Sequence, residues 1–334
     1  MKLFPKLTML RVRSALFSMA FAMPCTGWAQ AAAYPSKPIT IIVPFAAGGP
    51  VDAVARGIAV PMSRVLKQPV LIENVAGAGG AIGAAKVANA NPDGYTLVLG
   101  HAGTHAFSFA LNPNLSYKPV EDFKPIAMLA TMASVLSIPA ASPFKDANGL
   151  IAYAKANPKK LNFGHAGNGS VSHLAALSLM DNAKIEFTFV PYRGSAPAFT
   201  DLISGQLDAL FDTSVQAIPQ AQGGRVRSLA VTSSKRLTAL PSTQTFEEAC
   251  CSNLTLEIWY ALFAPKGTPA SIVNALESAA TASLSDKKYR DSMLKSNVGI
   301  PDIGKANKDQ LEATMRRDIV RFTALARRTN AKAE

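Results

Sequence analysis

Glycines 48 and 49 stand where a strand-like run ends and a helical pattern begins. The segment Val43-Pro-Phe-Ala-Ala-Gly-Gly-Pro-Val-Asp52 passes through glycine to a proline, which is favoured at the first position of a helix. N–H groups at a helix start carry partial positive charge, and glycine lets an anion approach them closely. The pattern is typical of an anion site and equally of a tight turn. Asp52 is interpreted first as a carboxylate that caps the first turn.

A second junction of this kind occurs at Phe163-Gly-His-Ala-Gly-Asn-Gly-Ser170, just before a helical stretch. It adds hydroxyl and amide donors to the glycines. Ser170 is a candidate helix cap, and Ser195 is another further along the chain. Two such junctions that faced each other would clamp one carboxylate.

Other patterns that could carry chemistry are weaker. The chain lacks G-x-S-x-G, H-E-x-x-H and G-x-x-x-x-G-K-[ST], so common hydrolase and nucleotide-binding motifs find no support. His101 and His105 bracket a glycine without an adjacent carboxylate, which indicates loop donors rather than metal ligands. The glycines between 77 and 83 have the wrong spacing for a dinucleotide fingerprint and indicate close helix packing. Arg193 fits a ligand carboxylate and an ordinary surface position equally well.

The N-terminal segment predicts export. Four basic residues in the first thirteen precede an apolar run over 14–23, and Pro24 and small residues follow. This pattern is typical of a cleaved signal peptide, here 1–31 with its end between 29 and 33, and the run is too short for a membrane span. Without the four basic residues the net charge falls from +12 to +8. We therefore expect a periplasmic mature protein, and its 49% hydrophobic content predicts a globular fold.

Cys250 and Cys251 are the only cysteines of the predicted mature chain, and they are adjacent. Adjacent cysteines permit two thiols or a strained vicinal disulfide, but no long-range staple. Their adjacency excludes a CxxC redox pair, and their number excludes a four-cysteine zinc site. We interpret the pair as inert or incidental in redox terms.

Strand-like and Ala-rich helical stretches alternate along the chain, which predicts βα units and parallel sheets. A helix is expected from Pro50, and Thr268-Pro269 repeats the pattern of a cap followed by proline. The tail over 308–328 is amphipathic, and its basic face is interpreted as solvated rather than as a nucleic-acid surface. The predicted strands are Ile39–Phe45, Val70–Asn74, Thr96–Gly100, Leu161–Gly164, Glu186–Val190, Ala209–Asp212 and Ser228–Thr232.

Taken together, these residues resemble a known family, the periplasmic substrate-binding proteins of tripartite tricarboxylate transporters, also called Bug proteins. The resemblance spans nearly the whole predicted mature chain. The matching segments are Tyr34–Ile39, Val43–Phe45 with Gly48–Gly49 and Asp52–Arg56, Gly77–Gly80, Asn91–Thr96, Thr104–Ala106, Asp122–Ala127, Gly167–Ser170, His173–Ala175, Val190–Ser195, Gly205–Asp208, Leu229–Thr232, Trp259–Tyr260 and Pro265–Pro269.

The resemblance implies an α/β architecture, namely a two-lobed type II periplasmic-binding-protein fold. Each lobe is expected to be a mostly parallel sheet flanked by helices, with a ligand cleft between the lobes. Lobe 1 would comprise 34–134 and 256–334, and lobe 2 would comprise 135–255. A ligand carboxylate would be gripped by neutral donors of the two glycine-rich loops, partly through water, which lowers the expectation for Arg193. The predicted ligand-binding residues are Phe45, Ala47, Gly48, Gly49, Asp52, His101, Thr104, His105, Gly167, Asn168, Ser170, Val171 and Asp212.

The chain departs from the family pattern in three places. Ser108-Phe109 stands where Asn-Pro is frequent, His165 replaces a small residue, and Ala249-Cys-Cys-Ser-Asn253 replaces a glycine-proline turn. Phe107 and Phe109 could line a pocket for an aromatic or longer apolar acid. His101 and His165 could add donors or a pH-sensitive charge.

The expected function is capture of a small organic carboxylate in the periplasm and its delivery to the permease subunits of a tripartite tricarboxylate transporter. The acid could be a dicarboxylate, a tricarboxylate, an amino acid or an aromatic acid. We expect a monomer without cofactor, metal, nucleic-acid partner or enzymatic activity. A sensing module that presents its closed form to a signalling receptor remains an alternative, and so does an exported hydrolase or isomerase, although no acid–base pair is evident.

Overall fold

The computed structural model describes residues 34–112, 114–251 and 254–331, together with Met1. The predicted signal peptide and part of the 249–253 turn lie outside the described residues. Residues 34–334 form one compact unit. No described helix is long and apolar enough to cross a bilayer.

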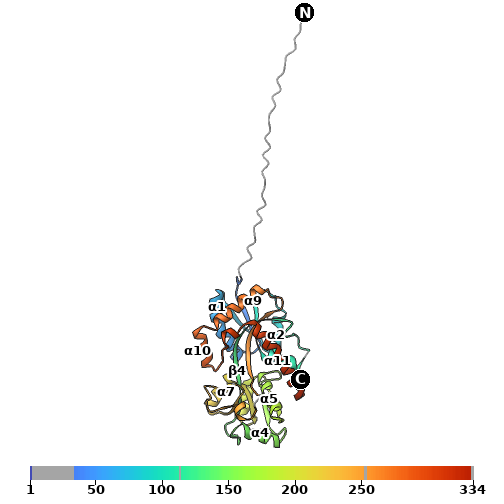
Figure 1. The fold of residues 1–334 in the computed structure, drawn as a ribbon, viewed down its shortest axis with the longest axis vertical. Coiled ribbons are helices and arrows are strands. Elements are labelled where there is room, and N and C mark those ends of the chain that lie inside the picture. The colour runs from blue at the N-terminus through green and yellow to red at the C-terminus, as the bar shows by residue number, and fades with distance from the viewer. Residues whose placement is uncertain (2–33, 113, 252–253, 332–334) are drawn as a thin grey trace. The chain divides into compact units, whose positions relative to one another are not determined.

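The fold is organised around β4 (Phe123–Pro139), a strand of 17 residues that is almost entirely buried. Among the described residues, ten strands form one continuous sheet, and β4 belongs to both of its halves. Its first part, up to Ala133, pairs with β10 (Glu257–Pro265), whereas its second part, from Ser134, pairs with β7 (Ala209–Thr213) and β8 (Val226–Val231). Figure 1 shows β4 running between the two groups of helices.

In the first half, β1 (Ile39–Val43) lies between β2 (Val70–Asn74) and β3 (Thr96–His101) and is parallel to both. β10 is antiparallel to β3 and to β4. In the second half, β5 pairs in parallel with β6 and β7, and β8 pairs in parallel with β9. The bounds of these remaining strands are Asn162–His165 for β5, Thr188–Pro191 for β6 and Gln244–Thr245 for β9.

Helices flank both halves of the sheet (Figure 1), and the bounds of all of them are as follows. The α-helices are α1 (Pro50–Leu66), α2 (Ala81–Ala88), α3 (Ser108–Leu111), α4 (Ala147–Ala156), α5 (Val171–Ala183), α6 (Ser195–Ile203), α7 (Ser214–Gln222), α8 (Phe246–Ala249), α9 (Ala270–Ser283), α10 (Lys287–Lys295) and α11 (Lys308–Thr329). The short helical turns are η1 (Ala78–Gly80), η2 (Gly103–Phe107), which is π-helical, and η3 (Ile303–Lys305).

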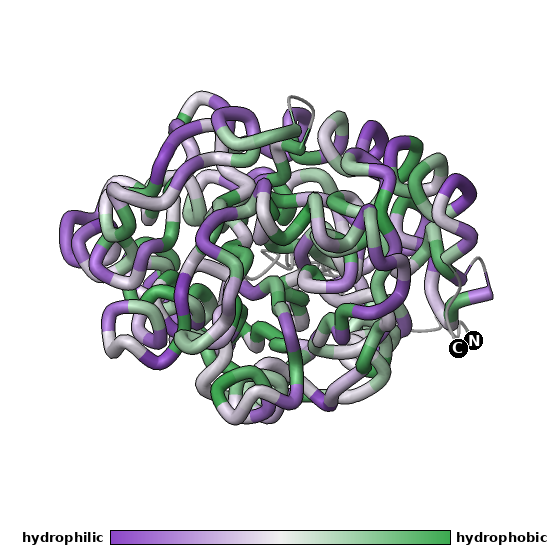
Figure 2. The backbone as a smooth tube through the Cα atoms, turned by 90° about the horizontal axis from the view of Figure 1, so that it is seen from below, coloured by the Kyte–Doolittle hydropathy of each residue, from purple (hydrophilic) through white to green (hydrophobic). Residues whose placement is uncertain are grey.

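Apolar burial explains how these elements pack. One cluster of buried apolar side chains runs through both halves of the sheet, from Ile41 of β1 to Leu177 of α5. In Figure 2 the hydrophilic stretches lie mostly on outer turns and helices, and hydrophobic stretches run through the interior. The amphipathic tail forms α11 as predicted, and its apolar residues Leu311, Met315 and Phe322 are buried. Burying such a stripe stabilises a helix far more than its intrinsic propensity does.

Every predicted strand run overlaps a strand, but β4, β10 and the two-residue strand β9 were missed. β4 is an apolar run of unusual length that contains proline at both ends, so it lacks the two-residue alternation and the length that mark ordinary strands. Because β4 and β10 run antiparallel to their neighbours, the expectation of parallel sheets holds only for the outer strands of each half.

Two predicted helix caps are wrong by one residue. Gly194 caps α6, and its φ of 112° is a conformation that glycine tolerates, so Ser195 is the first helical residue. Pro269 is the N-cap of α9, because the Thr268 hydroxyl donates instead to the Pro265 carbonyl. The predicted cap at Ser170 is confirmed, since its side chain accepts from His173 N–H.

Candidate functional site

Beyond the carboxyl ends of the outer parallel strands, Gly79 and Gly103 of the first half lie against the loop before α5 in the second half. β1 and β3 end at one edge of the first half, and β5 and β7 end at one edge of the second. Backbone atoms from the two edges are in contact: a Cβ added to Gly79 would lie 3.1 Å from the Asn168 carbonyl oxygen, and one added to Gly103 would lie 3.1 Å from that of Gly169. Ligands of open α/β sheets bind outside the carboxyl ends of the strands, which makes this junction the candidate site.

The loop between β1 and α1 presents its backbone to solvent. Ala47 and Gly48 are exposed, Phe45 and Gly49 are half-buried, and Gly48 has a φ of 85° that favours glycine. No side chain caps α1. The N–H groups of Gly49, Val51 and Asp52 belong to the first four positions of a helix and therefore have no intrahelical acceptor, and Pro50 has no N–H at all. Three amides without an intrahelical acceptor at one helix start are what an anion site here would require.

The carboxylate of Asp52 forms hydrogen bonds that hold this loop in place. One carboxylate oxygen accepts from Gly48 N–H at 3.0 Å and from Arg56 Nε at 2.8 Å, and the other accepts from Asn74 Nδ2 at 2.9 Å. The side chain is buried. Burial alone would raise the pKa of Asp52, but the bonds from Arg56, Gly48 and Asn74 hold it below its usual value. This arrangement favours the first-turn role over a direct ligand contact, and it occupies the Gly48 amide.

The loop between β5 and α5 is organised by hydroxyl groups. Ser170 Oγ accepts from His173 N–H at 3.3 Å, and Ser172 Oγ accepts from Ala166 N–H at 2.8 Å. Gly167, with a φ of 109°, and Asn168 are half-buried, and Val171 begins α5 as a buried residue. Because Ser170 caps α5, the side chain of Asn168 is not used as a cap, and Gly167 and Asn168 stay available at the junction.

His101 is buried at the end of β3, among residues of the first half of the sheet. Its Nδ1 accepts from Gly103 N–H at 2.8 Å, so the proton of the neutral ring resides on Nε2. The ring stacks on Phe45 at 5.1 Å and meets the edge of Tyr260 at 5.5 Å. Burial lowers the pKa of His101 to about 4, so the ring is neutral between pH 5.5 and 8. Desolvation disfavours the imidazolium, which favours the donor role of His101 over a pH-sensitive charge.

His105 and Thr104 lie deeper than predicted. The His105 ring stacks on Phe263 at 4.1 Å, and its Nδ1 lies 2.9 Å from the Thr104 hydroxyl. Both side chains are fully buried, and burial together with the nearby His101 lowers the pKa of His105 to about 3. The expectation of an irregular loop here is wrong, because β3 extends through His101 and continues into the π-helical turn η2.

The remaining candidates are distributed around the junction. Asp212 ends up buried near the end of β7, and Arg193 is exposed after β6. Phe107 is fully buried against Phe322 and His173, whereas Phe109 is half-buried. Among the described residues, no group of three or more His, Cys, Asp or Glu side chains could hold a metal ion.

Sequence reasoning missed several residues that form the junction. Tyr260 contacts His101, and Gly79 touches the Asn168 backbone, although the glycine cluster had been assigned only to helix packing. That packing is also present, since a Cβ on Gly83 would lie 2.7 Å from Pro44 Cα. The glycine cluster was the available signal for Gly79. Tyr260 lies in the Trp259–Tyr260 segment that carries the resemblance, but nothing placed it at the site, because it reaches the junction through the unexpected strand β10.

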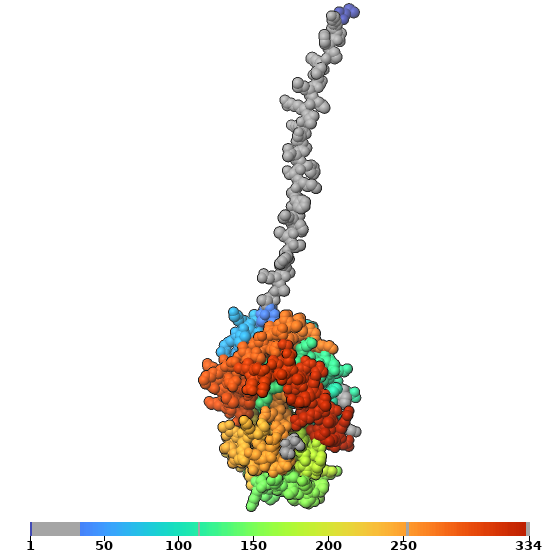
Figure 3. Space-filling view, in the orientation of Figure 1, coloured from blue at the N-terminus to red at the C-terminus, as the bar shows by residue number. Residues whose placement is uncertain are grey.

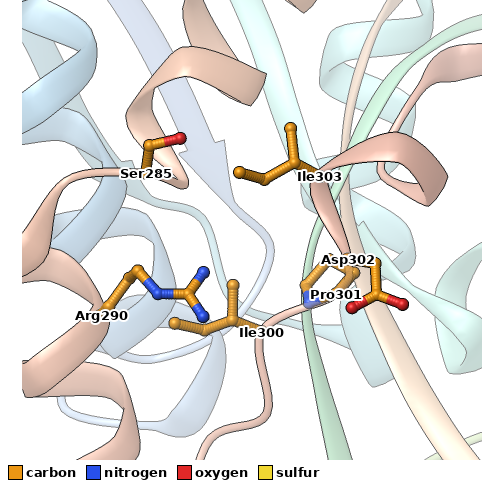
Figure 4. Close-up of a pocket in the computed structure, with 6 residues that line it drawn as sticks. All are labelled: Ser285, Arg290, Ile300, Pro301, Asp302 and Ile303. Atoms are coloured by element: carbon orange, nitrogen blue, oxygen red, sulfur yellow. The ribbon is translucent and has the colours of Figure 1, made fainter.

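A depression of about 380 Å³ lies elsewhere, on the surface beside α10 and η3. In Figure 4 Arg290 reaches into this space from α10, opposite Ile303. The residues that line it are Ser285, Arg290, Ile300, Pro301, Asp302 and Ile303. No residue of the glycine-rich loops lines it, so it is separate from the candidate site.

Cys250 and Cys251 also lie away from these loops. Both are free thiols whose Sγ atoms are 2.6 Å apart, and Cys250 is exposed whereas Cys251 is buried.

Comparison with known proteins identifies the family. Residues 54–329 match the model of the tripartite tricarboxylate transporter family receptor. The chain is 42% identical over 272 residues to the UPF0065 protein of the TAR-I ttuE-ttuC' intergenic region of Agrobacterium vitis, covering 81% of this chain and 78% of that protein.

Solved structures agree with this result. The periplasmic binding protein BugD matches with a TM-score of 0.82 and 34% identity, over 90% of this chain and 100% of that one. MatC from Rhodopseudomonas palustris with bound malate matches with a TM-score of 0.81 and 37% identity, over 87% and 99%. The chain has the two-lobed α/β fold of these proteins. It therefore belongs to the tripartite tricarboxylate transporter receptor family, the periplasmic solute-binding proteins of the Bug type.

Proposed function

We propose that this protein captures a small organic carboxylate in the periplasm and delivers it to the permease subunits of a tripartite tricarboxylate transporter, without a chemical step. The observation that carries the proposal is the uncapped start of α1 behind an exposed glycine loop. Phe45 of this loop lies beside Gly80, and the neighbouring Gly79 lies against the Asn168 backbone of the loop before α5. The similarity to MatC, which holds malate, supports a carboxylate as the ligand class.

Neutral donors would hold the carboxylate. The amides of Gly49, Val51 and Asp52 supply N–H groups, and Asn168 adds a side-chain amide from the opposite loop. Amide dipoles stabilise an anion without the desolvation cost of burying a full positive charge. Asp52 would contribute indirectly, because its bonds to Gly48 and Asn74 fix the shape of the loop. The direct roles of His101, Thr104 and His105 stay predictions.

Closure of the two lobes would follow ligand binding. We assign 34–134 and 256–334 to lobe 1 and 135–255 to lobe 2, and the change of β4 partners between Ala133 and Ser134 supports this division. Under this division Gly79 of lobe 1 lies against the Asn168 backbone of lobe 2. A ligand that contacts both lobes only when they meet shifts the population towards closure by its differential affinity.

The proposal is tested by ligand-induced thermal shifts. The mature protein, expressed from Gln30, is unfolded and refolded to remove carried ligand, and is then heated with malate, citrate, glutamate or nicotinate. Each acid is compared with its amide. A ligand at about a hundred times its Kd adds ~2.7 kcal/mol to the unfolding free energy. A rise in Tm with an acid and not with its amide supports the carboxylate clamp, and equal behaviour of acid and amide, or no shift at all, contradicts it.

A further inference from the structure

Asp212 is a buried carboxyl group at the junction between the two halves. It is the penultimate residue of β7, is only 4% exposed and pairs with Val135 of β4. β7 is parallel to β5, so Asp212 lies at the same sheet edge as the Gly167–Ser170 loop. The carboxyl group is therefore placed where the second half of the sheet faces a ligand.

One of its two oxygens has no partner within hydrogen-bond distance among the described residues. Oδ1 accepts from Thr213 N–H at 2.6 Å, and Oδ2 is the oxygen without a partner at that distance, although the Ser195 and Thr213 hydroxyls lie near enough to lower the pKa of the carboxyl. The groups that act on the carboxyl, Ser195 of α6 and Thr213, are both neutral, and neither supplies a cation. A buried polar atom without a partner is costly, and in a binding site the ligand can supply the partner.

A continuous wall joins Asp212 to the α1 loop. Burial raises the pKa of the Tyr260 hydroxyl on β10, and Asp212 lies near enough to raise it further. The Tyr260 ring meets His101, and the His101 ring stacks on Phe45, which leads into the exposed Gly48 loop. A ligand clamped at the α1 start would thus have Asp212 at the far end of this wall.

The surroundings of Asp212 favour its protonated form. Its neighbours are Ser195, Thr213, Tyr260 and the apolar Val135, and His101 behind Tyr260 is neutral. Burial raises the pKa of Asp212 to about 6, against the opposing influence of the Ser195 and Thr213 groups. A carboxylate placed against Oδ2 would favour the proton further, because two like charges at short distance disfavour joint ionisation.

We propose that Asp212 binds the second carboxylate of the ligand through a proton held between the two groups, so that the site selects dicarboxylates. The inference rests on the proposed function, since the first carboxylate occupies the clamp. The proton comes from solvent on binding, and no other bond forms or breaks.

The proposal predicts tighter binding at lower pH. With a pKa of about 6, Asp212 is half protonated at pH 6 and roughly 1% protonated at pH 8. Aliphatic dicarboxylates are largely dianions across this range. Malate should therefore bind about fifty-fold more weakly at pH 8 than at pH 6, with uptake of one proton at pH 8.

The test is isothermal titration calorimetry with malate on the refolded mature protein at pH 6 and pH 8, in two buffers of different ionisation enthalpy. Asp212→Asn keeps a hydrogen-bond donor that does not titrate, so it should bind malate with little pH dependence and more tightly than wild type at pH 8. Asp208→Asn, just before the same strand, is the matched control and should behave as wild type. Lactate, which lacks the second carboxylate, should bind weakly at both pH values.

Clear outcomes would overturn the inference. These are an equal pH dependence in wild type and Asp212→Asn, tighter binding at pH 8, equal affinity for malate and lactate, or no binding of malate. If malate is silent while another acid of the panel binds, the dicarboxylate inference fails and the proposed function stands, whereas silence of every acid refutes both. If Asp212→Asn does not fold, proton uptake by the wild type in the two buffers still decides.

Discussion

A methyl group at Gly48 should separate ligand binding from stability. Gly48 has a φ of 85°, and a Cβ added there would meet no atom within 4 Å. Gly205, in the turn after α6, has a φ of 81° and the same open space around its Cβ. The two glycines are matched in backbone conformation, but only Gly48 lies in the loop that we assign to the ligand.

The expected effect on stability is small and similar for both variants. An alanine in the left-handed region costs about 1–2 kcal/mol, and the reduced entropy of the unfolded chain returns ~0.4–1 kcal/mol. Gly48→Ala and Gly205→Ala should each lose about 1 kcal/mol of unfolding free energy, or a few degrees of Tm.

The expected effect on binding is large for one variant only. At Gly48 the methyl group would occupy the approach of the carboxylate to the α1 amides. Each lost hydrogen bond to a charged group costs roughly 1.5–3 kcal/mol, which corresponds to a loss of affinity of about ten- to hundred-fold.

The assay combines urea unfolding with calorimetric titration of the acid that gives the largest thermal shift. Gly205→Ala should bind that acid as the wild type does. Equal affinities of Gly48→Ala and Gly205→Ala would refute the assignment of the α1 loop to the ligand, whatever their stabilities.

Three further predictions concern the surrounding structure. The pKa of Asp52 is lower in the folded state than in the unfolded state, so its contribution to stability is complete above about pH 4 and is lost as the pH falls through the folded pKa. In urea unfolding, the unfolding free energy of Asp52→Asn should therefore fall less steeply with decreasing pH than that of the wild type. Parallel plots of unfolding free energy against pH would contradict this. The buried Trp259 indole N–H donates to the Asp318 carboxylate at 2.9 Å, and Asp318→Ala removes this acceptor. We expect a loss of about 1–3 kcal/mol of unfolding free energy, measured by urea unfolding with Trp259 fluorescence as the probe. An unchanged urea midpoint would contradict this. The Arg328 side chain of α11 forms an ion pair with Asp181 of α5 at 2.8 Å, between the proposed lobes, and Figure 3 shows the C-terminal helix against this segment. Because half-exposed ion pairs are worth ~0.2–1 kcal/mol, Arg328→Ala should weaken ligand affinity by up to about five-fold in calorimetry. Unaltered affinity would exclude a role of this ion pair in closure.

Local sequence signals predicted the loops of the site well. Pro50 after two glycines and Ser170 before α5 determine backbone geometry through nearest neighbours, so both helix starts were found. The amphipathic stripe of α11 was equally clear. In each case a few adjacent residues determine the structure, which makes the pattern independent of the rest of the fold.

Features that depend on distant partners were not predictable. The 17-residue strand β4 is stable because β10, β7 and β8 pair with it, and nothing local marks such a long strand. The burial of His105 follows from its contact with Phe263 of β10. The unpartnered oxygen of Asp212 is likewise a property of tertiary packing, because Tyr260 and Ser195 come from other elements.

The central claim is that a ligand carboxylate lies between the start of α1 and the Gly167–Ser170 loop. A crystal structure of the refolded mature protein, grown with the acid that gives the largest thermal shift, tests it most directly. The account predicts carboxylate density within hydrogen-bond distance of the amides of Gly49, Val51 or Asp52, directly or through one water. Density for the acid confined to another place, such as the depression beside Arg290, would contradict it.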